Sequence, residues 1–247
     1  MPWRSKLLIY GLTWSEGHDR VVQIERAFEK YLRAPIVWYS DTPDDRFHPR
    51  IVSKASYPIV TWRCKEMYKD VHTNFPNYDW YLRTWDDTYI VPTHIYEVLN
   101  EYDASQSIEV GRLGSHAWKG REEVFVDGGA GSLMSASAFH TFGSNLDRCM
   151  ILANNNDPAL GWAAEDVIFS HCKLRLNITL RSHCGFHHTS DTKKVTTITN
   201  DCRLASTQRE HSGRCPLVSL HYVKDFEWLH RFLRPRCHRS FNDSSSQ

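Results

Sequence analysis

Apolar residues form two kinds of pattern along the first hundred residues of the chain: continuous runs and helical spacing. Continuous apolar runs ended by turn-forming residues predict strands over 6–10, 35–39 and 80–85. Apolar residues at helical spacing predict helices over 21–32 and 61–73, and a third helix that carries Ile95, Val98 and Leu99. Strands that alternate with helices build a parallel sheet, so the expected fold class is α/β.

The second half of the chain continues this alternation less regularly. We expect a strand at 124–126, helices that start near 135, 145 and 163, a strand at 217–223 and a last amphipathic helix over 226–233. The polar stretches 44–58 and 180–214 are expected to be irregular. Because no linker divides the chain, residues 1–239 are predicted to form one domain, followed by a disordered Ser-rich tail over 240–247.

Two adjacent acids, Asp86 and Asp87, follow the apolar strand at 80–85. In open α/β sheets, ligands bind beyond the carboxyl ends of the strands. Two carboxylates placed there repel each other unless a cation lies between them, and Mg²⁺ or Mn²⁺ carrying a diphosphate would satisfy both. The alternative is a solvated turn, since a bare Asp-Asp pair is weak evidence of a metal site.

Two further stretches are candidates for functional residues. Residues 127–131 contain three glycines, which permit positive φ and the close approach of a bound group, although a plain turn explains them equally well. Glu165 and Asp166 fall in the first turn of a predicted helix. Acids there either complement the helix dipole or, at the rim of a pocket, supply a general base.

The composition is that of a globular protein and narrows the classes of partner. Of 247 residues, 41% are hydrophobic and 24% are charged, and the formal net charge is +1. This near-neutral balance gives no reason to expect nucleic acid or an anionic membrane as a partner. No apolar run approaches the length of a membrane span and no signal peptide is visible, so we expect any membrane association to depend on a targeting segment absent from this chain.

Seven cysteines favour an oxidising compartment, where disulfides form. No Cys-x-x-Cys pair occurs, so a zinc site of that kind is poorly supported. The pairings first expected are Cys149 with Cys172 and Cys202 with Cys215, and the odd count leaves a thiol free or paired between chains, which is compatible with a homodimer. Acceptor sequons for N-glycosylation at Asn177 and Asn242 fit the same compartment.

Four stretches, in this order, resemble the Fringe-like β1,3-glycosyltransferases, a family that includes the core 1 galactosyltransferases. Residues 78–90 resemble the acidic metal-binding motif of the family, and residues 127–135 resemble its Gly-Gly-Ala-Gly acceptor-side motif. Residues 162–167 resemble its Glu-Asp-Val helix start, and residues 219–223 resemble the Ser-Phe-His-Tyr-Val strand of the core 1 branch. The similarity extends from near residue 6 to near residue 234.

The resemblance implies a GT-A type glycosyltransferase fold, with a single Rossmann-like nucleotide-binding sheet and flanking helices. It implies that residues 1–110 form the half that takes the nucleotide sugar and residues 111–239 the half that takes the acceptor. It also implies a set of site residues: Asp87 and His221 as ligands of Mn²⁺, Asp86 as a supporting ligand or ribose contact, Asp166 as the general base beside Glu165, Asp41 at the uridine, Arg20 at the diphosphate, and Trp118, Gly128 and Gly129 in the pocket for the sugars.

The activity implied is an inverting, Mn²⁺-dependent transfer of galactose from UDP-galactose to the 3-hydroxyl of Ser/Thr-linked GalNAc on a glycoprotein, in the lumen of the Golgi or endoplasmic reticulum. Three alternatives stay open: a Fringe-type transfer of N-acetylglucosamine from UDP-GlcNAc to O-fucose, a non-catalytic relative that acts as a chaperone, and a nucleotide-sugar lectin without turnover. One departure bears on the choice, because Trp85 stands where the family commonly has the first of three acids.

Overall fold

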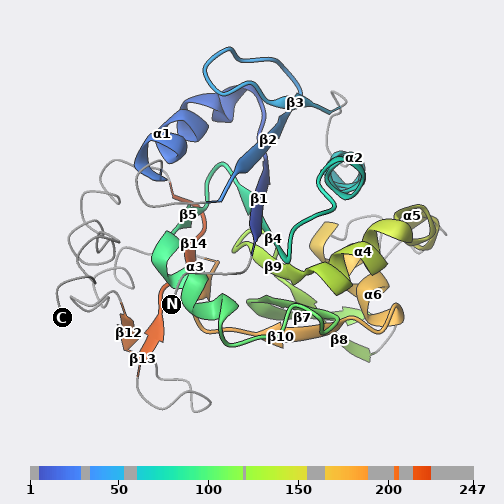
Figure 1. Cartoon of the computed structure of the whole chain (residues 1–247). Coiled ribbons are helices and arrows are strands. Elements are labelled where there is room, and N and C mark those ends of the chain that lie inside the picture. Colours follow the sequence, from blue (N-terminus) through green and yellow to red (C-terminus); the bar gives the residue numbers. More distant parts are fainter. Residues whose placement is uncertain are drawn as a thin grey trace.

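The computed structural model of the chain describes residues 6–28, 34–52, 60–118, 121–154, 165–188, 203–205 and 214–223. Its main element is a seven-stranded sheet (Figure 1), whose strands in spatial order are β10 (Thr179–Ser182), β6 (Ile108–Gly111), β9 (Ser132–Ser135), β4 (Trp80–Trp85), β1 (Leu7–Leu12), β2 (Ile36–Ser40) and β3 (Arg50–Ile51). Strand β9 runs against its neighbours β4 and β6, and the other pairs are parallel. The α/β fold expected from the sequence is confirmed.

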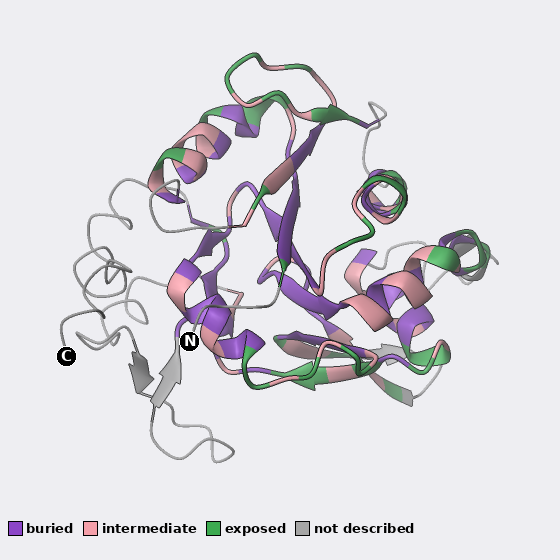
Figure 2. Cartoon of the chain, viewed as in Figure 1, coloured by how far each residue is buried: buried purple, intermediate pink, exposed green. Residues whose placement is uncertain are grey.

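The two central strands are the most apolar part of the sheet. Every residue of β1 and of β4 is buried. Figure 2 shows these strands in the buried colour from end to end. A strand that is covered on both faces needs a continuous apolar run, which is the pattern that predicted both strands.

One face of the sheet is covered by two helices and a small second sheet. The helices are α1 (His18–Phe28), which follows the 3₁₀ turn η1 (Ser15–Gly17), and α3 (Pro92–Leu99). The second sheet has the order β11 (Phe186–His187), β14 (Ser219–Leu220) and β5 (Tyr89–Ile90). Buried apolar residues of all these elements except η1 pack against β1 and β4 in one cluster.

Four helices cover the opposite face. They are α2 (Val60–Asn74), α4 (Ala136–Ser144), α5 (Leu146–Asn154) and α6 (Glu165–Arg175), which Figure 1 shows together on one side of the sheet. Aromatic rings fill this second cluster, in which Tyr81 of β4 stacks on Phe139 of α4 with ring centroids 3.9 Å apart. Two antiparallel pairs complete the fold: β7 (Leu113–Trp118) with β8 (Arg121–Val126), and β12 (Arg203–Ala205) with β13 (Arg214–Pro216).

The structure corrects the prediction in the stretches that lack a clear period. The stretch expected to be a loop at 44–58 contains β3, and the stretch expected to be irregular at 180–214 contains β11 and β12 and runs into β13. The glycines at 127–131 lead into strand β9 before the helix that was expected to follow them directly. The predicted helix at 226–233 and the predicted tail lie outside the described residues.

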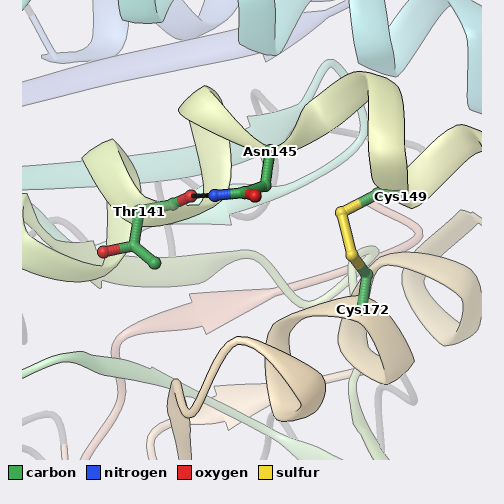
Figure 3. The surroundings of a disulfide bond; sticks show 4 residues. All are labelled: Thr141, Asn145, Cys149 and Cys172. Atoms are coloured by element: carbon green, nitrogen blue, oxygen red, sulfur yellow. Dashed lines mark hydrogen bonds between the residues drawn. A yellow bond between two sulfur atoms is a disulfide. The ribbon is translucent and has the colours of Figure 1, made fainter.

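A disulfide joins two of the helices on the second face. Cys149 of α5 and Cys172 of α6 are bonded, with Cα atoms 5.5 Å apart (Figure 3), so this predicted pairing is confirmed. Cys184 is also disulfide-bonded. Cys64 is a buried free thiol. The predicted pairing of Cys202 with Cys215 lies outside the residues whose side chains are described.

The junction between α4 and α5 is closed by a side chain. The Asn145 amide nitrogen donates to the Thr141 carbonyl over 2.9 Å (Figure 3). Among the described residues, no helix combines the length and the apolar character needed to cross a bilayer.

Candidate active site

The turn after β4 and the end of β14 bring Asp87 and His221 together. Strand β14 pairs antiparallel with β5, with Leu220 opposite Tyr89. Beyond the paired residues, the Val223 N–H donates to the Asp87 carbonyl over 2.9 Å. As a result, His221 Nε2 lies 3.2 Å from Asp87 Oδ1. The two residues expected as metal ligands are therefore in contact.

The spacing and the chemistry of this pair suit a divalent ion. Neighbouring ligand atoms of a six-coordinate ion with bonds of about 2.1 Å lie roughly 3 Å apart. Carboxylate oxygen is a ligand for Mn²⁺ and Mg²⁺, and imidazole nitrogen adds preference for transition metals. His221 is only 7% exposed, and its Nδ1 atom has no hydrogen-bond partner among the described residues. A buried polar atom without a partner is costly, so the Nδ1 side of the ring, which is the side away from the Asp87 contact, is suited to a ligand of its own.

Asp86, the third residue expected at the metal, is engaged elsewhere. Its Oδ2 atom accepts hydrogen bonds from Thr13 Oγ1 over 2.8 Å and from an Arg20 guanidinium nitrogen over 2.9 Å. Burial raises the pKa of this carboxyl above its ordinary value, and the nearby Arg20 charge works in the other direction. A Cβ atom at Gly17 would overlap Asp86, so η1 packs directly on the carboxylate. Asp86 and Arg20 thus fix the start of α1 to the end of β4.

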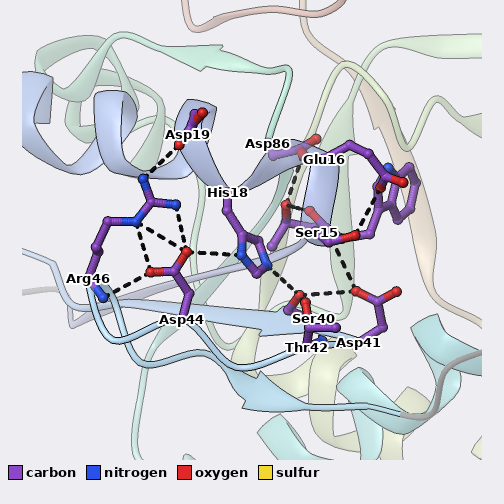
Figure 4. Close-up of polar contacts among 12 residues, drawn as sticks. Ser15, Glu16, His18, Asp19, Ser40, Asp41, Thr42, Asp44, Arg46 and Asp86 are labelled. Carbon is purple, nitrogen blue, oxygen red and sulfur yellow. Dashed lines mark hydrogen bonds and ion pairs between the residues drawn. The ribbon is translucent and has the colours of Figure 1, made fainter.

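Asp41 lies in a polar network at the same end of the sheet (Figure 4). Its Oδ1 atom accepts from the Ser15 N–H and from Ser40 Oγ, each over 3.3 Å. Ser40 Oγ also lies 2.7 Å from His18 Nε2, and His18 Nδ1 lies 3.0 Å from Asp44 Oδ2. Asp41, Arg20 and Asp86, which were expected on the nucleotide side, all gather around η1 and the start of α1.

The glycine-rich loop between β8 and β9 is tied to the ends of several strands. Side chains from β4, from the turn that precedes β5, and from β14 donate to three successive carbonyls of the loop: Trp85 Nε1 to Gly128 over 3.0 Å, Thr88 Oγ1 to Gly129 over 2.8 Å, and Ser219 Oγ to Ala130. The loop is therefore held at the same edge of the sheet as Asp87 and His221. Trp85, which stands where the resemblance would place an acid, instead anchors the loop through this hydrogen bond.

Two glycines of this loop are required by its geometry. Gly131 has a φ of +81°, in the left-handed region that side chains other than glycine rarely adopt. Gly129 lies against the imidazole of His221, and a Cβ atom there would overlap the ring. The glycine stretch is therefore more than a plain turn, because it leaves room for His221.

Asp166 and Glu165 stand at the first turn of α6, on the other side of the loop. Asp166 Oδ2 accepts from the Gly128 N–H over 3.1 Å. Burial, together with the neighbouring Glu165 charge, raises the pKa of Asp166 to about 6. Glu165 forms a buried ion pair with Arg83 of β4, which anchors the start of α6 to the central strand.

The base candidate and a metal-ligand candidate lie beside neighbouring residues of one dipeptide. Gly128 contacts Asp166, and the next residue, Gly129, contacts His221. Consecutive Cα atoms are about 3.8 Å apart. The glycine loop therefore brings the base candidate and His221 into the same small region of the molecule.

Some residues of this site were not expected from the sequence, and one expected residue lies outside the described side chains. Arg83, Asp127 and His188 belong to the site but were not named; Asp127 precedes the glycines, whereas nothing in the spacing marks His188. Trp118 is the last residue of β7, and its side chain lies outside those described.

Comparisons with known proteins give the context for this site. Residues 15–225 match a family model described as Fringe-like. A human protein named chondroitin sulfate glucuronyltransferase is 28% identical over 114 residues, which cover 45% of this chain and only 15% of that protein's length. The crystal structure of a glycosyltransferase involved in the glycosylation of the major capsid of PBCV-1 aligns over 93% of this chain and 99% of its own, with a TM-score of 0.54 and 10% identity.

The structural alignment shows that the fold is that of a glycosyltransferase. The family match runs through Asp87, Asp166 and His221 and covers most of the chain. On the family match, the chain belongs to the Fringe-like family of glycosyltransferases.

Proposed function

We propose that the chain is an inverting, metal-dependent glycosyltransferase that moves a sugar from a UDP-sugar to a hydroxyl group of a glycoprotein glycan. One arrangement carries the proposal: Asp87 and His221 approach to 3.2 Å, and Asp166 contacts Gly128, the residue next to the glycine that lies against His221. A solvated Asp-Asp turn would give no reason for a buried histidine to meet Asp87.

Asp87 and His221 are the residues that would hold Mn²⁺. When bound, a divalent ion neutralises the charge that develops on the leaving diphosphate. Asp86 accepts a hydrogen bond from Arg20, and Asp41, near the same end of the sheet, is the residue that would contact the uridine.

Asp166 accepts the proton of the acceptor hydroxyl in this proposal. With a pKa raised to about 6, it is ionised at neutral pH and is more basic than an ordinary aspartate, which suits a general base. The Glu165–Arg83 ion pair holds the helix that carries it. An inverting transfer needs no covalent nucleophile, so a single base suffices.

Galactose, passed to the 3-hydroxyl of Ser/Thr-linked GalNAc, is the first donor and acceptor pair to test, because residues 219–223 resemble the core 1 branch. N-acetylglucosamine passed to O-fucose is the second. The name of the human relative adds glucuronic acid as a third donor. The Cys149–Cys172 disulfide supports the oxidising lumen of the secretory pathway as the compartment.

The test is UDP release from UDP-galactose, UDP-GlcNAc and UDP-glucuronic acid with matched glycopeptide acceptors, with and without Mn²⁺. We expect one donor to be consumed only with both Mn²⁺ and an acceptor. The Asp166→Asn variant should lower kcat by roughly 10²–10⁴ and keep Mn²⁺-dependent UDP binding.

Calorimetry with UDP and Mn²⁺ separates the alternatives. A chain that binds no UDP in the presence of the metal would favour the chaperone-like relative. A chain that binds UDP but consumes none of the donors would favour a lectin without turnover.

A further inference from the structure

A second ligand set lies around His221 and includes none of the other residues expected at the metal. Asp127 follows β8, His188 follows β11 and His221 follows β14. One potential ligand atom from each of the three residues lies within 4.8 Å of the other two. We refer to these three residues as the Asp-His-His cluster.

Strand register explains why the two histidines meet. Strands β11 and β14 are parallel, with His187 opposite Leu220. The residue that follows each strand is a histidine, so this pairing brings His188 and His221 side by side, with ring centroids 5.1 Å apart. His188 Nδ1 also lies 2.6 Å from Asp127 Oδ2. Ligand atoms of one cation with bonds of about 2.1 Å lie roughly 3–4 Å apart, so small side-chain adjustments would fit the cluster around an ion.

The two ring nitrogens of His221 differ in their surroundings. Nε2 faces the Asp87 carboxylate at 3.2 Å, whereas Nδ1 has no hydrogen-bond partner among the described residues. Carboxylates commonly bond one nitrogen of a histidine whose other nitrogen binds a metal. The pairing of Asp87 with Nε2 therefore leaves Nδ1 as the nitrogen suited to a cation.

We propose that Asp127, His188 and His221 bind a divalent cation of the Mn²⁺ and Zn²⁺ class in the absence of any nucleotide. The proposal rests on the proposed function only in that both use His221. A neutral imidazole has one acceptor nitrogen, so the ring holds a cation at the Asp-His-His cluster or at the Asp87 side, one at a time. The cluster is thus a site where the nucleotide-free protein keeps an ion next to the place where the donor would need it.

Arg112 provides a second test, in which a substitution is expected to raise the affinity for the cation. One of its guanidinium nitrogens lies 2.9 Å from Asp127 Oδ2, the same oxygen that approaches His188. The side chain of Arg112 is half exposed, so it can move aside when a metal ion binds. Its positive charge nevertheless competes with a cation for Asp127, and removing that charge should strengthen metal binding.

The experiment is calorimetric titration of the full chain with MnCl₂ and with ZnCl₂, without nucleotide. We expect one cation per chain. His188→Ala should weaken its binding by at least about tenfold, and Asp127→Asn should do the same, since each removes one ligand of three. Arg112→Gln should tighten binding, and Asp87→Asn should leave a cation bound. Circular dichroism checks that each variant is folded. His188→Ala is the substitution least disruptive to the core, because His188 is partly exposed.

Three results would overturn the proposal: no cation binding by the parent chain without nucleotide, no effect of His188→Ala, or loss of nucleotide-free binding in Asp87→Asn alone. Each of them leaves the proposed transferase testable, because Mn²⁺-dependent UDP binding is measured separately. Conversely, a chain that binds the cation but never binds UDP supports the cluster and contradicts the transferase.

Discussion

At the scale of single residues, the chemistry proposed for the site depends on the pKa that the fold gives to Asp166. Its carboxyl group is largely removed from water and stands beside Glu165, and both effects raise its pKa to about 6. The hydrogen bond from the Gly128 N–H lowers the pKa but does not cancel them. The fold thus holds this group close to the pKa that a base needs near neutral pH.

This pKa predicts a pH dependence of activity. Only the ionised carboxylate accepts a proton, so kcat/KM of the productive donor should fall about tenfold per pH unit below pH 6 and level off above it. Measuring kcat/KM from pH 4.5 to 8.5 checks this. The residual activity of Asp166→Asn should not fall below pH 6 in this way. If kcat/KM of Asp166→Asn still decreased at acid pH, the decrease would have to be assigned to another group.

The same shift in pKa predicts that Asp166 destabilises the folded protein as the pH rises, over the range in which activity increases. The folded-state pKa lies above the unfolded value near 3.8, so the protonated group stabilises the fold below about pH 4, and this contribution is lost as the pH rises through about 6. Relative to the parent, Asp166→Asn should therefore gain unfolding free energy between pH 4 and pH 7, by roughly 3 kcal/mol at most. Urea unfolding at both pH values measures it, and an equal difference at both would contradict the assignment.

Gly129 offers a test of the metal side of the site. Gly129→Ala places a methyl group where the His221 ring lies, so the ring must move away from Asp87. We expect Mn²⁺-dependent UDP binding to weaken by at least about tenfold, in the range found for residues that orient metal ligands.

Gly131→Ala is the matched control. It strains a backbone with a φ of +81° and leaves the His221 ring untouched. It should lower the unfolding free energy by about 1–2 kcal/mol and leave UDP binding unchanged. Equal effects of the two variants on UDP binding would indicate that any disturbance of the loop disrupts the site.

At the scale of elements, the sequence predicts those strands and helices that have a continuous apolar run or a helical period of apolar residues. β1, β4 and the helix α2 were located from such patterns, and Asp87 was placed correctly at the end of β4. The contact between Asp87 and His221 was expected only from the family resemblance. It depends on the register of β5 with β14, two strands of two residues each, which are too short to show a period. The position of His188 depends on a similar short register, which explains why the sequence did not reveal it.

At the same scale, the disulfide anchors the helix that carries Asp166, the proposed base. Cys149 and Cys172 are 23 residues apart and join α5 to α6, the helix whose first turn carries Asp166. Replacing both cysteines by serine should lower the unfolding free energy by about 3 kcal/mol, because a closed loop of this length restricts the unfolded chain. Guanidinium unfolding measures the loss. Cys64→Ser, which removes a buried free thiol, controls for loss of a buried sulfur atom, and an equal loss in both variants would contradict a special role of the bond.

At the scale of the whole molecule, the site exists only when three separate packing units are in place. β4 and its turn come from the main sheet, His221 from the small sheet on one face, and Asp166 from α6 on the other face. The glycine loop touches all three. An unfolded chain therefore has no such site, and a ligand that needs all of it binds the folded state alone.

This assembly predicts a linkage between ligand binding and global stability. UDP added at about 100 times its dissociation constant, with Mn²⁺ already present, should raise the unfolding free energy by about 2.7 kcal/mol. UDP without a divalent ion should add much less, because the diphosphate then lacks the cation that Asp87 and His221 would hold. Urea unfolding of the parent chain and of Asp87→Asn, each with Mn²⁺ alone and with Mn²⁺ plus UDP, isolates the increment that UDP adds. Asp87→Asn should lose that increment even if it retains a cation at the Asp-His-His cluster, whereas an undiminished increment in this variant would show that the nucleotide is held without the Asp87 carboxylate.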